Sequence, residues 1–256
     1  MKEHLIQIDA GACIGCGLCS RDCPENNIRI KDRKAVLDGQ NCIKCGHCVA
    51  ICPKAAVAMT GFDEPPEELE SRSVVDSHRL LEALKARRSV RRFQNRPVPD
   101  EVIAQIVEAG RFTPTAKNLQ DVSYVVLREE IGRCEALAVR FFQKLLPFAK
   151  LFYPPAGKVA VDGDFFFKKA PAAIVIYAKD KINGALAASN MALMAEANGL
   201  GVLYSGFFTI AANHAGRLRK TLRIKGKQAV TTLVLGYPDV AYRRTAQKET
   251  AEVRRL

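Results

Sequence analysis

The spacing of eight cysteines near the start of the chain constrains the fold more than any other feature. Cys13, Cys16, Cys19 and Cys23 precede Pro24, and the same five residue types recur 29 positions later, from Cys42 to Pro53. Each copy has the spacing C-x2-C-x2-C-x3-C-P, with which bacterial iron–sulfur proteins bind clusters, the fourth Cys serving the cluster of the other copy. We therefore predict two [4Fe-4S] clusters, with the ligand sets Cys13, Cys16, Cys19 and Cys52, and Cys42, Cys45, Cys48 and Cys23.

Zinc is the main alternative to an iron–sulfur cluster, because tetrahedral zinc sites also use four thiolates. Zinc ribbons use two separated C-x2-C pairs, however, which leaves the third Cys and the Pro of each copy unexplained. Gly15, Gly17 and Gly46 lie within the motifs and suit a backbone that curls around a large inorganic core. We expect His47 to be a partly exposed non-ligand, because each cluster already has four thiolates, and Cys134 to be a small buried hydrophobe.

The sequence predicts three segments. Residues 1–60 contain the repeat, with short strand-like runs at 5–8, 28–30, 35–37 and 57–59. They resemble two-cluster bacterial ferredoxins, which implies a low-potential, one-electron relay. Residues 61–76 are rich in acidic residues and proline and read as a solvated linker. Residues 77–256 form the largest segment.

This third segment alternates helix and strand patterns, which indicates an α/β or α+β layer domain. The expected helices and strands are these: helices at 78–87, 100–109, 133–144, 185–197 and 210–222, and strands at 123–127, 172–178, 201–205 and 229–236. We expect Asp76 and Ser77 to cap the first helix, and Asp100 and Gly110 to bound the second. The alanine-rich helix suggests close packing against a second copy of the chain.

Charge and composition bear on whether the protein binds nucleic acid or a membrane. The 256 residues have an ordinary globular composition, with 48% hydrophobic and 26% charged residues, and a formal net charge of +12. The excess lies in residues 77–256, which hold 30 basic and 15 acidic side chains. No helix-turn-helix, zinc-finger or aromatic stacking motif accompanies it, so we expect no nucleic-acid partner. Polar residues interrupt every long apolar stretch, no secretory signal is visible, and the cysteines cluster, so we expect no membrane span and a cytoplasmic location.

Two polar segments in this basic region are candidates for binding a phosphorylated heteroaromatic ligand. Arg87, Arg88 and Ser89 supply guanidinium forks and a hydroxyl suited to a phosphate monoester, although a solvated charge run is the commoner explanation. The loop from Pro114 to Gln120 supplies small and amide-bearing residues that suit the flat edge of a heteroaromatic ring.

Two further segments, Gly199-Leu200-Gly201 and Gly236-Tyr237-Pro238, follow these two polar segments along the chain. With all four, residues 77–256 resemble the FMN-dependent nitroreductase family. The resemblance implies an α+β fold with a central, mostly antiparallel sheet and a homodimer with two flavins between its subunits. It also implies which residues bind the flavin. At the phosphate and ribityl chain lie Arg87, Arg88 and Ser89, with Arg243 or Arg244 near the phosphate, and Arg91 lies near flavin N1 and O2. A loop that reaches the flavin of the other subunit contains Pro114, Thr115, Ala116, Asn118 and Gln120, and the segment under the ring, with a backbone N–H at N5, contains Tyr204, Ser205 and Gly206.

Two departures from the family pattern leave the electron donor and acceptor open. Gln120-Asp121-Val122 stands where many members have Q-P-W, and Ser205 stands at a position that is acidic in nicotinamide-using members. No dinucleotide fingerprint is present. We expect an oxidoreductase that passes electrons from a low-potential donor, a ferredoxin-like protein or NAD(P)H, through the clusters to FMN and on to a nitroaromatic, a quinone or another conjugated acceptor. The alternative is an electron-transfer module that serves a protein partner and has no substrate of its own.

Overall fold

The computed structural model describes residues 4–39, 41–69, 75–152 and 160–256, and it divides the chain into two compact units. The first unit comprises residues 1–74 and 116–119, and the second comprises residues 75–115 and 120–256. Within the expected linker, the described residues 61–69, 75 and 76 form no helix or strand, and residues 70–74 lie outside the described part.

The first unit is built from two antiparallel strand pairs, of which β2 and β3 form a hairpin, and two one-turn helices. Strand β1 (Ile6–Ile8) pairs antiparallel with β4 (Val57–Met59), and β2 (Ile28–Lys31) with β3 (Lys34–Leu37), which confirms the four short strands expected from sequence. Helices α1 (Leu18–Arg21) and α2 (His47–Ala50) each begin inside one cysteine motif. The repeat in the sequence is therefore a repeat of structure.

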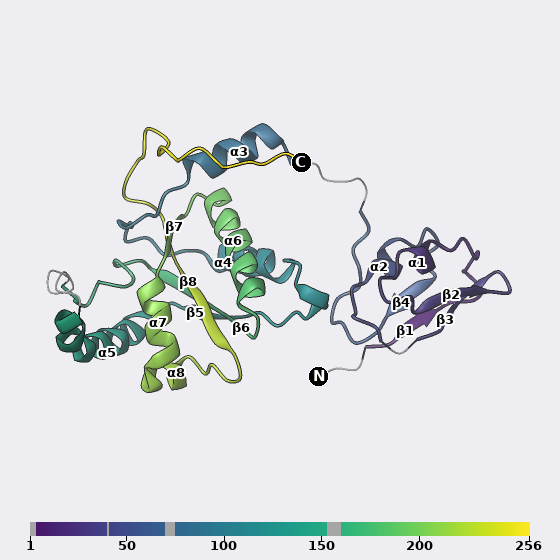
Figure 1. Ribbon diagram of the computed structural model, residues 1–256, viewed down its shortest axis with the longest axis horizontal. Helices are drawn as coiled ribbons and strands as arrows, with labels where there is room; N and C mark the ends of the chain where they lie inside the picture. Colours follow the sequence, from purple (N-terminus) through teal and green to yellow (C-terminus); the bar gives the residue numbers. More distant parts are fainter. Residues whose placement is uncertain (1–3, 40, 70–74, 153–159) are drawn as a thin grey trace. The chain divides into compact units, whose positions relative to one another are not determined.

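The second unit is organised around one sheet with the strand order β5-β6-β8-β7 (Figure 1). Its strands are β5 (Ser123–Leu127), β6 (Ala172–Ala178), β7 (Gly201–Tyr204) and β8 (Gln228–Gly236). Every neighbouring pair is antiparallel, as the family resemblance implied. Strand β6 is an almost unbroken apolar run because both of its faces are buried.

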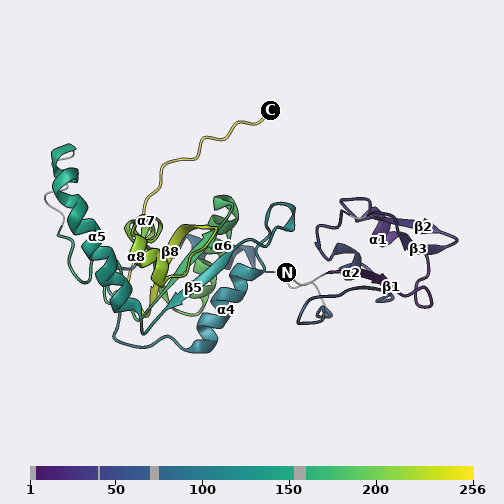
Figure 2. The same cartoon turned by 90° about the horizontal axis from the view of Figure 1, so that it is seen from below.

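Helices cover both faces of this sheet (Figure 2). On one face lie α4 (Asp100–Arg111) and α6 (Lys181–Ala197), where Met191 packs with Ile174 and Ile176 of β6. On the other lie α5 (Ile131–Phe152), α7 (Gly206–His214) and α8 (Gly216–Thr221), where Phe208 joins a core with Ala173 and Val175 of the same strand. Alternate residues of β6 thus serve opposite cores.

Several expected boundaries were wrong. The single helix expected at 210–222 is two helices, because Ala215 adopts an extended backbone (φ −82°, ψ 103°) between α7 and α8. Asp76 does cap α3 (Ser77–Ala86), with its side chain accepting from Arg79 N at 2.7 Å. Gly110, however, lies inside α4, where a Cβ would clash with the Tyr124 hydroxyl and the Met191 sulfur.

Most alanines of α6 pack inside the second unit. Ala187, Ala188, Ala192 and Ala195 are buried in the second unit, which explains their small size without a partner subunit. Among the described residues, no helix is both long and apolar enough to cross a membrane.

Candidate functional site

The cysteine motifs fold as tight loops that end in short helices. Gly17 and Gly46 immediately precede α1 and α2 with φ values of 75° and 74°, in the left-handed region that glycine tolerates best. Gly15 also has a positive φ, and a Cβ there would run into the Arg33 carbonyl. The expectation that these glycines let the backbone curl is confirmed.

Cys23 of the first motif faces a cavity together with three cysteines of the second. This cavity has a volume of about 280 Å³, and Cys23, Cys42, Cys45 and Cys48 line it. A single water needs only about 10–15 Å³ measured in this way, so the space suits a far larger group. Among the described residues, no three His, Cys, Asp or Glu side chains lie close enough together to hold a single metal ion. A donor set of four thiols around a large cavity fits a [4Fe-4S] cluster.

Cys52 of the second motif lies near two cysteines of the first motif, Cys16 and Cys19. Burial raises the pKa of Cys19, and the neighbouring Cys52 and Cys16 thiolates raise it further. Burial raises the pKa of Cys48 to about 11, with Cys45 and Cys42 adding to the effect. Cys42 and Cys45 thus lie near Cys48 in the second motif, and Cys16 and Cys52 lie near Cys19 of the first.

Backbone N–H groups donate to several of these sulfurs. Asn27 N donates to Cys23 Sγ and Ala56 N donates to Cys52 Sγ, both at 3.3 Å and both four residues along the chain. Ala35 N donates to Cys13 Sγ at 3.3 Å, and this bond is the largest influence that lowers the pKa of Cys13. Such N–H···S bonds stabilise negative charge on a cluster and tune its reduction potential.

In the second unit, the basic segment after α3 lines a second cavity of about 720 Å³. Extended pairing holds this segment against the sheet, because Val90 N donates to the Val202 carbonyl at 3.0 Å and Ser89 forms a bridge with Val202. The predicted residues that line the cavity are Arg87, Arg88, Ser89 and Tyr204. The structure thus brings the beginning of the domain and the end of β7 to one place.

The other predicted flavin residues lie elsewhere. Arg91 does not line this cavity and donates to the Ser89 carbonyl at 3.2 Å. Neither Arg243 nor Arg244 lines it, but the Arg244 carbonyl accepts from Arg88 Nη2 at 3.2 Å, which ties the C-terminal segment to the site. Buried Ser205 and exposed Gly206 directly follow Tyr204.

Sequence reasoning missed four polar residues of this cavity: Lys85, Glu196, Thr245 and Lys248. Glu196 is the one carboxylate among the lining residues. Burial raises its pKa, and the positive charge of Arg87 opposes that shift. A single Glu on an alanine-rich helix gives no signal in sequence, since only the fold brings it to Arg87.

The loop expected to face a flavin divides between the two units. Pro114 and Thr115 belong to the second unit, and Ala116 and Asn118 to the first, where they bound the short 3₁₀ helix η1 (Ala116–Asn118). Within the first unit Asn118 Nδ2 donates to the carbonyls of Ile43 and Lys44, at 3.1 and 2.7 Å.

Gln120 returns the loop to the second unit, with its backbone N–H donating to Thr115 Oγ1 at 3.0 Å. None of the residues from Pro114 to Gln120 lines the cavity formed by Arg87, Arg88 and Ser89, hereafter the basic cavity.

Asp121, the residue that departs from the Q-P-W pattern, anchors the chain just after this loop. Its buried carboxylate accepts from the backbone of Lys179 and Asp180, at 2.9 and 2.8 Å, and from Asn183 Nδ2 at 2.8 Å. Burial by itself would raise the pKa of Asp121, but these donors outweigh it and hold the pKa below its usual value. The departure replaces a rigid Pro with a hydrogen-bonded anchor at the start of α6.

Comparison with known proteins adds two family matches. Residues 84–237 match the nitroreductase family, and residues 5–53 match a 4Fe-4S dicluster domain.

Individual relatives are distant. A Methanothermobacter thermautotrophicus protein with the provisional name NADH dehydrogenase/NAD(P)H nitroreductase is 27% identical over 62% of this chain and 77% of its own length. An NADPH-dependent oxidoreductase of Staphylococcus epidermidis is 27% identical over 57% of this chain and 59% of its own length. The crystal structure of a nitroreductase with bound FMN from Bacteroides fragilis has a TM-score of 0.57, at 19% identity, over 69% of this chain and 98% of that one. At that identity the structural likeness concerns the fold.

Proposed function

Because the chain belongs to the nitroreductase family, we propose that it is an FMN- and iron–sulfur-dependent oxidoreductase. When bound, the two [4Fe-4S] clusters supply a one-electron relay from a low-potential donor, and FMN supplies two-electron reduction of a small conjugated acceptor such as a nitroaromatic or a quinone. The observation that carries the proposal is that one chain holds both a cavity with four cysteines and a cavity with Arg87, Arg88 and Ser89.

The chain's own residues have defined tasks in this proposal. Arg87 and Arg88 bind the FMN phosphate through charge-assisted hydrogen bonds, and the Ser89 hydroxyl adds a donor. Arg91 places positive charge near N1 and O2, which favours the reduced, anionic ring. Glu196 opposes these cations and limits how tightly a dianionic phosphate is held.

No protein nucleophile is required by this chemistry, since the reactive atom belongs to the flavin. The eight motif cysteines bind the clusters in the crossed sets given above. The names of the relatives favour NAD(P)H as one electron donor, and a ferredoxin-like protein is the other candidate.

We further propose that the enzyme is a homodimer. The apolar side of α3 supports this proposal, because Leu80, Leu81 and Leu84 are each more than 40% exposed and no residue of the helix is buried. Apolar side chains exposed together are typical of an association surface. A dimer mass at micromolar concentration is the expected result, and a monomer mass would refute it.

The decisive experiment is anaerobic purification followed by iron, sulfide and flavin counts, with the absorption spectrum of each centre. Reduced protein is then mixed with a nitroaromatic. Turnover by the purified protein alone supports an enzyme, whereas reduction that never passes to the acceptor supports an electron-transfer module with a protein partner. A colourless preparation that takes up neither cofactor would refute both.

Matched variants separate the two centres. Cys13→Ser and Cys42→Ser should each abolish turnover driven through the clusters while FMN stays bound. Cys134→Ala is the control, because Cys134 is buried in the second unit and lies outside both cysteine motifs. Loss of FMN from the Cys13 and Cys42 variants would instead assign the first unit a structural role.

A further inference from the structure

Ser205 lies where β7 passes into α7, directly after Tyr204 of the basic cavity. A Ser before the first turn of a helix usually accepts a hydrogen bond from a backbone N–H of that turn. Here the side chain of Ser205 makes no such bond, and its hydroxyl donates instead to the Phe166 carbonyl at 3.1 Å. Ser205 N in turn donates to the Thr232 carbonyl at 2.8 Å. Thr232 and Phe166 therefore both hold this short backbone segment, Phe166 through the Ser205 side chain.

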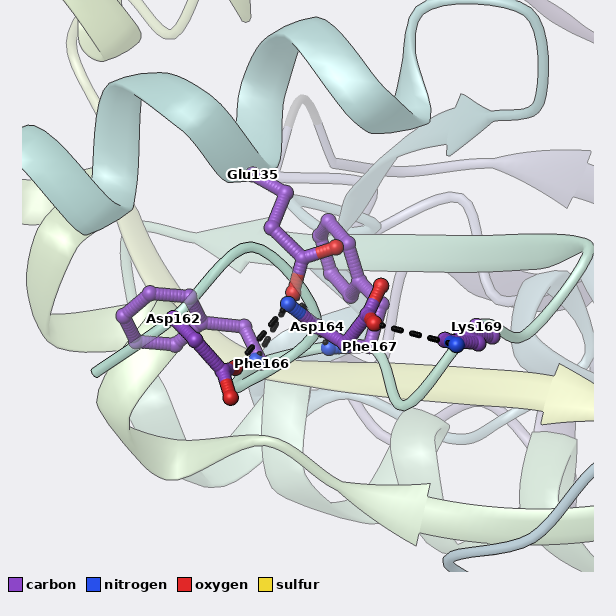
Figure 3. Close-up of polar contacts among 6 residues, drawn as sticks. All are labelled: Glu135, Asp162, Asp164, Phe166, Phe167 and Lys169. Carbon is purple, nitrogen blue, oxygen red and sulfur yellow. Dashed lines mark hydrogen bonds and ion pairs between the residues drawn. The ribbon is translucent and has the colours of Figure 1, made fainter. Parts of the chain in front are cut away.

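The Phe166–Phe167 peptide is held in turn by Glu135 of α5 (Figure 3). Phe166 N and Phe167 N both donate to Glu135 Oε1, at 2.8 and 3.0 Å. The carboxyl group is buried with the residue only 6% exposed, and burial raises its pKa while the two backbone donors oppose the shift. Two converging N–H groups fix the direction of both peptide planes.

One planar peptide unit links Glu135 to Ser205. Its N–H, from Phe167, donates to Glu135, and its C=O, from Phe166, accepts from Ser205. Because a peptide is planar and trans, fixing the N–H fixes the direction of the C=O. The residues that follow, Lys168 and Lys169, have positive φ values of 54° and 60°. Non-glycine residues rarely adopt such values, so the backbone preferences of these two lysines do not by themselves favour this turn.

We propose that Glu135 is a positioning residue for the Ser205–Gly206 backbone and acts through the Phe166–Phe167 peptide. This inference rests on the proposed function and on the family resemblance, which implies that this backbone donates an N–H to flavin N5. N5 accepts a hydrogen bond in the oxidised flavin and carries a hydrogen in the two-electron-reduced flavin, so a well-placed N–H favours the oxidised form. Loss of the Glu135 anchor is therefore expected to raise the flavin midpoint potential.

The test is an equilibrium measurement of the FMN midpoint potential in the full-length holoprotein. Glu135→Leu removes the acceptor but keeps an apolar volume, and its potential should rise. Glu135→Gln keeps an acceptor oxygen at the same reach and should stay near the wild-type potential. Val139→Ala, one turn further along α5 in the same core, removes packing without touching a hydrogen bond, and it should lower thermal stability and leave the potential unchanged.

A double-variant cycle with Ser205→Ala tests whether the two residues act along one route. Together, Glu135→Leu and Ser205→Ala should shift the potential no further than the larger single change, because both break the same connection. Additive shifts, or a wild-type potential in Glu135→Leu with only a loss of stability, would overturn the inference. If Glu135→Leu does not fold, Glu135→Asp replaces it, since its retracted carboxylate should shift the potential in the same direction, and an unshifted value would overturn the inference. Wild-type protein that takes up no FMN would instead refute the proposed function.

Discussion

Replacing Arg88 with Ala is the sharpest test of the basic cavity. A guanidinium carries five N–H donors, and Arg88 uses three hydrogen bonds on the carbonyls of Lys85, Arg87 and Arg244. These bonds hold the fork in place and leave two donors for a phosphate. A hydrogen bond to a charged group contributes about 1.5–3 kcal/mol, so the loss of this contact should weaken FMN binding about tenfold to 150-fold.

The assay is titration of deflavinated Arg88→Ala protein with FMN, followed by quenching of flavin fluorescence at about 0.15 M salt. Arg92→Ala is the matched control, because it removes the same charge nearby from an exposed residue that does not line the cavity. Its effect should be small, since charges exposed to solvent are screened over about 8 Å at this ionic strength. Equal losses in the two variants would show that net charge, and not the cavity, binds the cofactor, and would refute the reasoning.

Three further predictions concern the two units separately. Cys23→Ser should lose the same cluster as Cys42→Ser, with matching iron counts and electron paramagnetic resonance spectra, because both cysteines line one cavity; distinct spectra would contradict the crossed ligand sets. Ile106→Ala should lower the free energy of unfolding by about 2–5 kcal/mol in denaturant titrations, since the side chain is fully buried between α4 and the sheet, and a loss below 1 kcal/mol would contradict this packing. Because the folded state holds the pKa of Asp121 below its usual value, its stabilising effect is present above about pH 4 and is lost as the pH falls through the lower, folded-state pKa. The stability difference between wild type and Asp121→Asn should therefore shrink in acid, and a difference independent of pH down to acid unfolding would count against it.

The sequence predicted the strands of both units well. Strand β6 was visible as an unbroken apolar run because both of its faces are buried, and β1 to β4 were visible as short apolar runs beside the cysteine motifs. Helix ends were harder to predict. Gly110 resembled a helix terminator but is an interior residue, since the fold requires close approach of Tyr124 and Met191 there.

The candidate site divides in the same way. Regular spacing predicted all eight cysteines as cluster ligands, and the fold places Cys23 in one cavity with three cysteines of the second motif. The basic cavity was only partly foreseen: Arg87, Arg88 and Ser89 form a contiguous signal, whereas Glu196 and Lys248 lie far along the chain and carry no motif. Of the two predicted arginines, Arg243 and Arg244, the structure ties Arg244 to the site through its backbone carbonyl, which accepts from Arg88 Nη2.

Sequence by itself determined the family and the candidate cluster ligands, because cluster ligation depends on residue type and on spacing within a loop, which are properties of neighbours along the chain. Tertiary structure decided which distant groups act together, as with Glu135 and Ser205, which meet through one peptide of a turn between them. Such links depend on the direction of single hydrogen bonds across the packed core. No local pattern encodes that direction, since any buried Glu or Ser must find some partner.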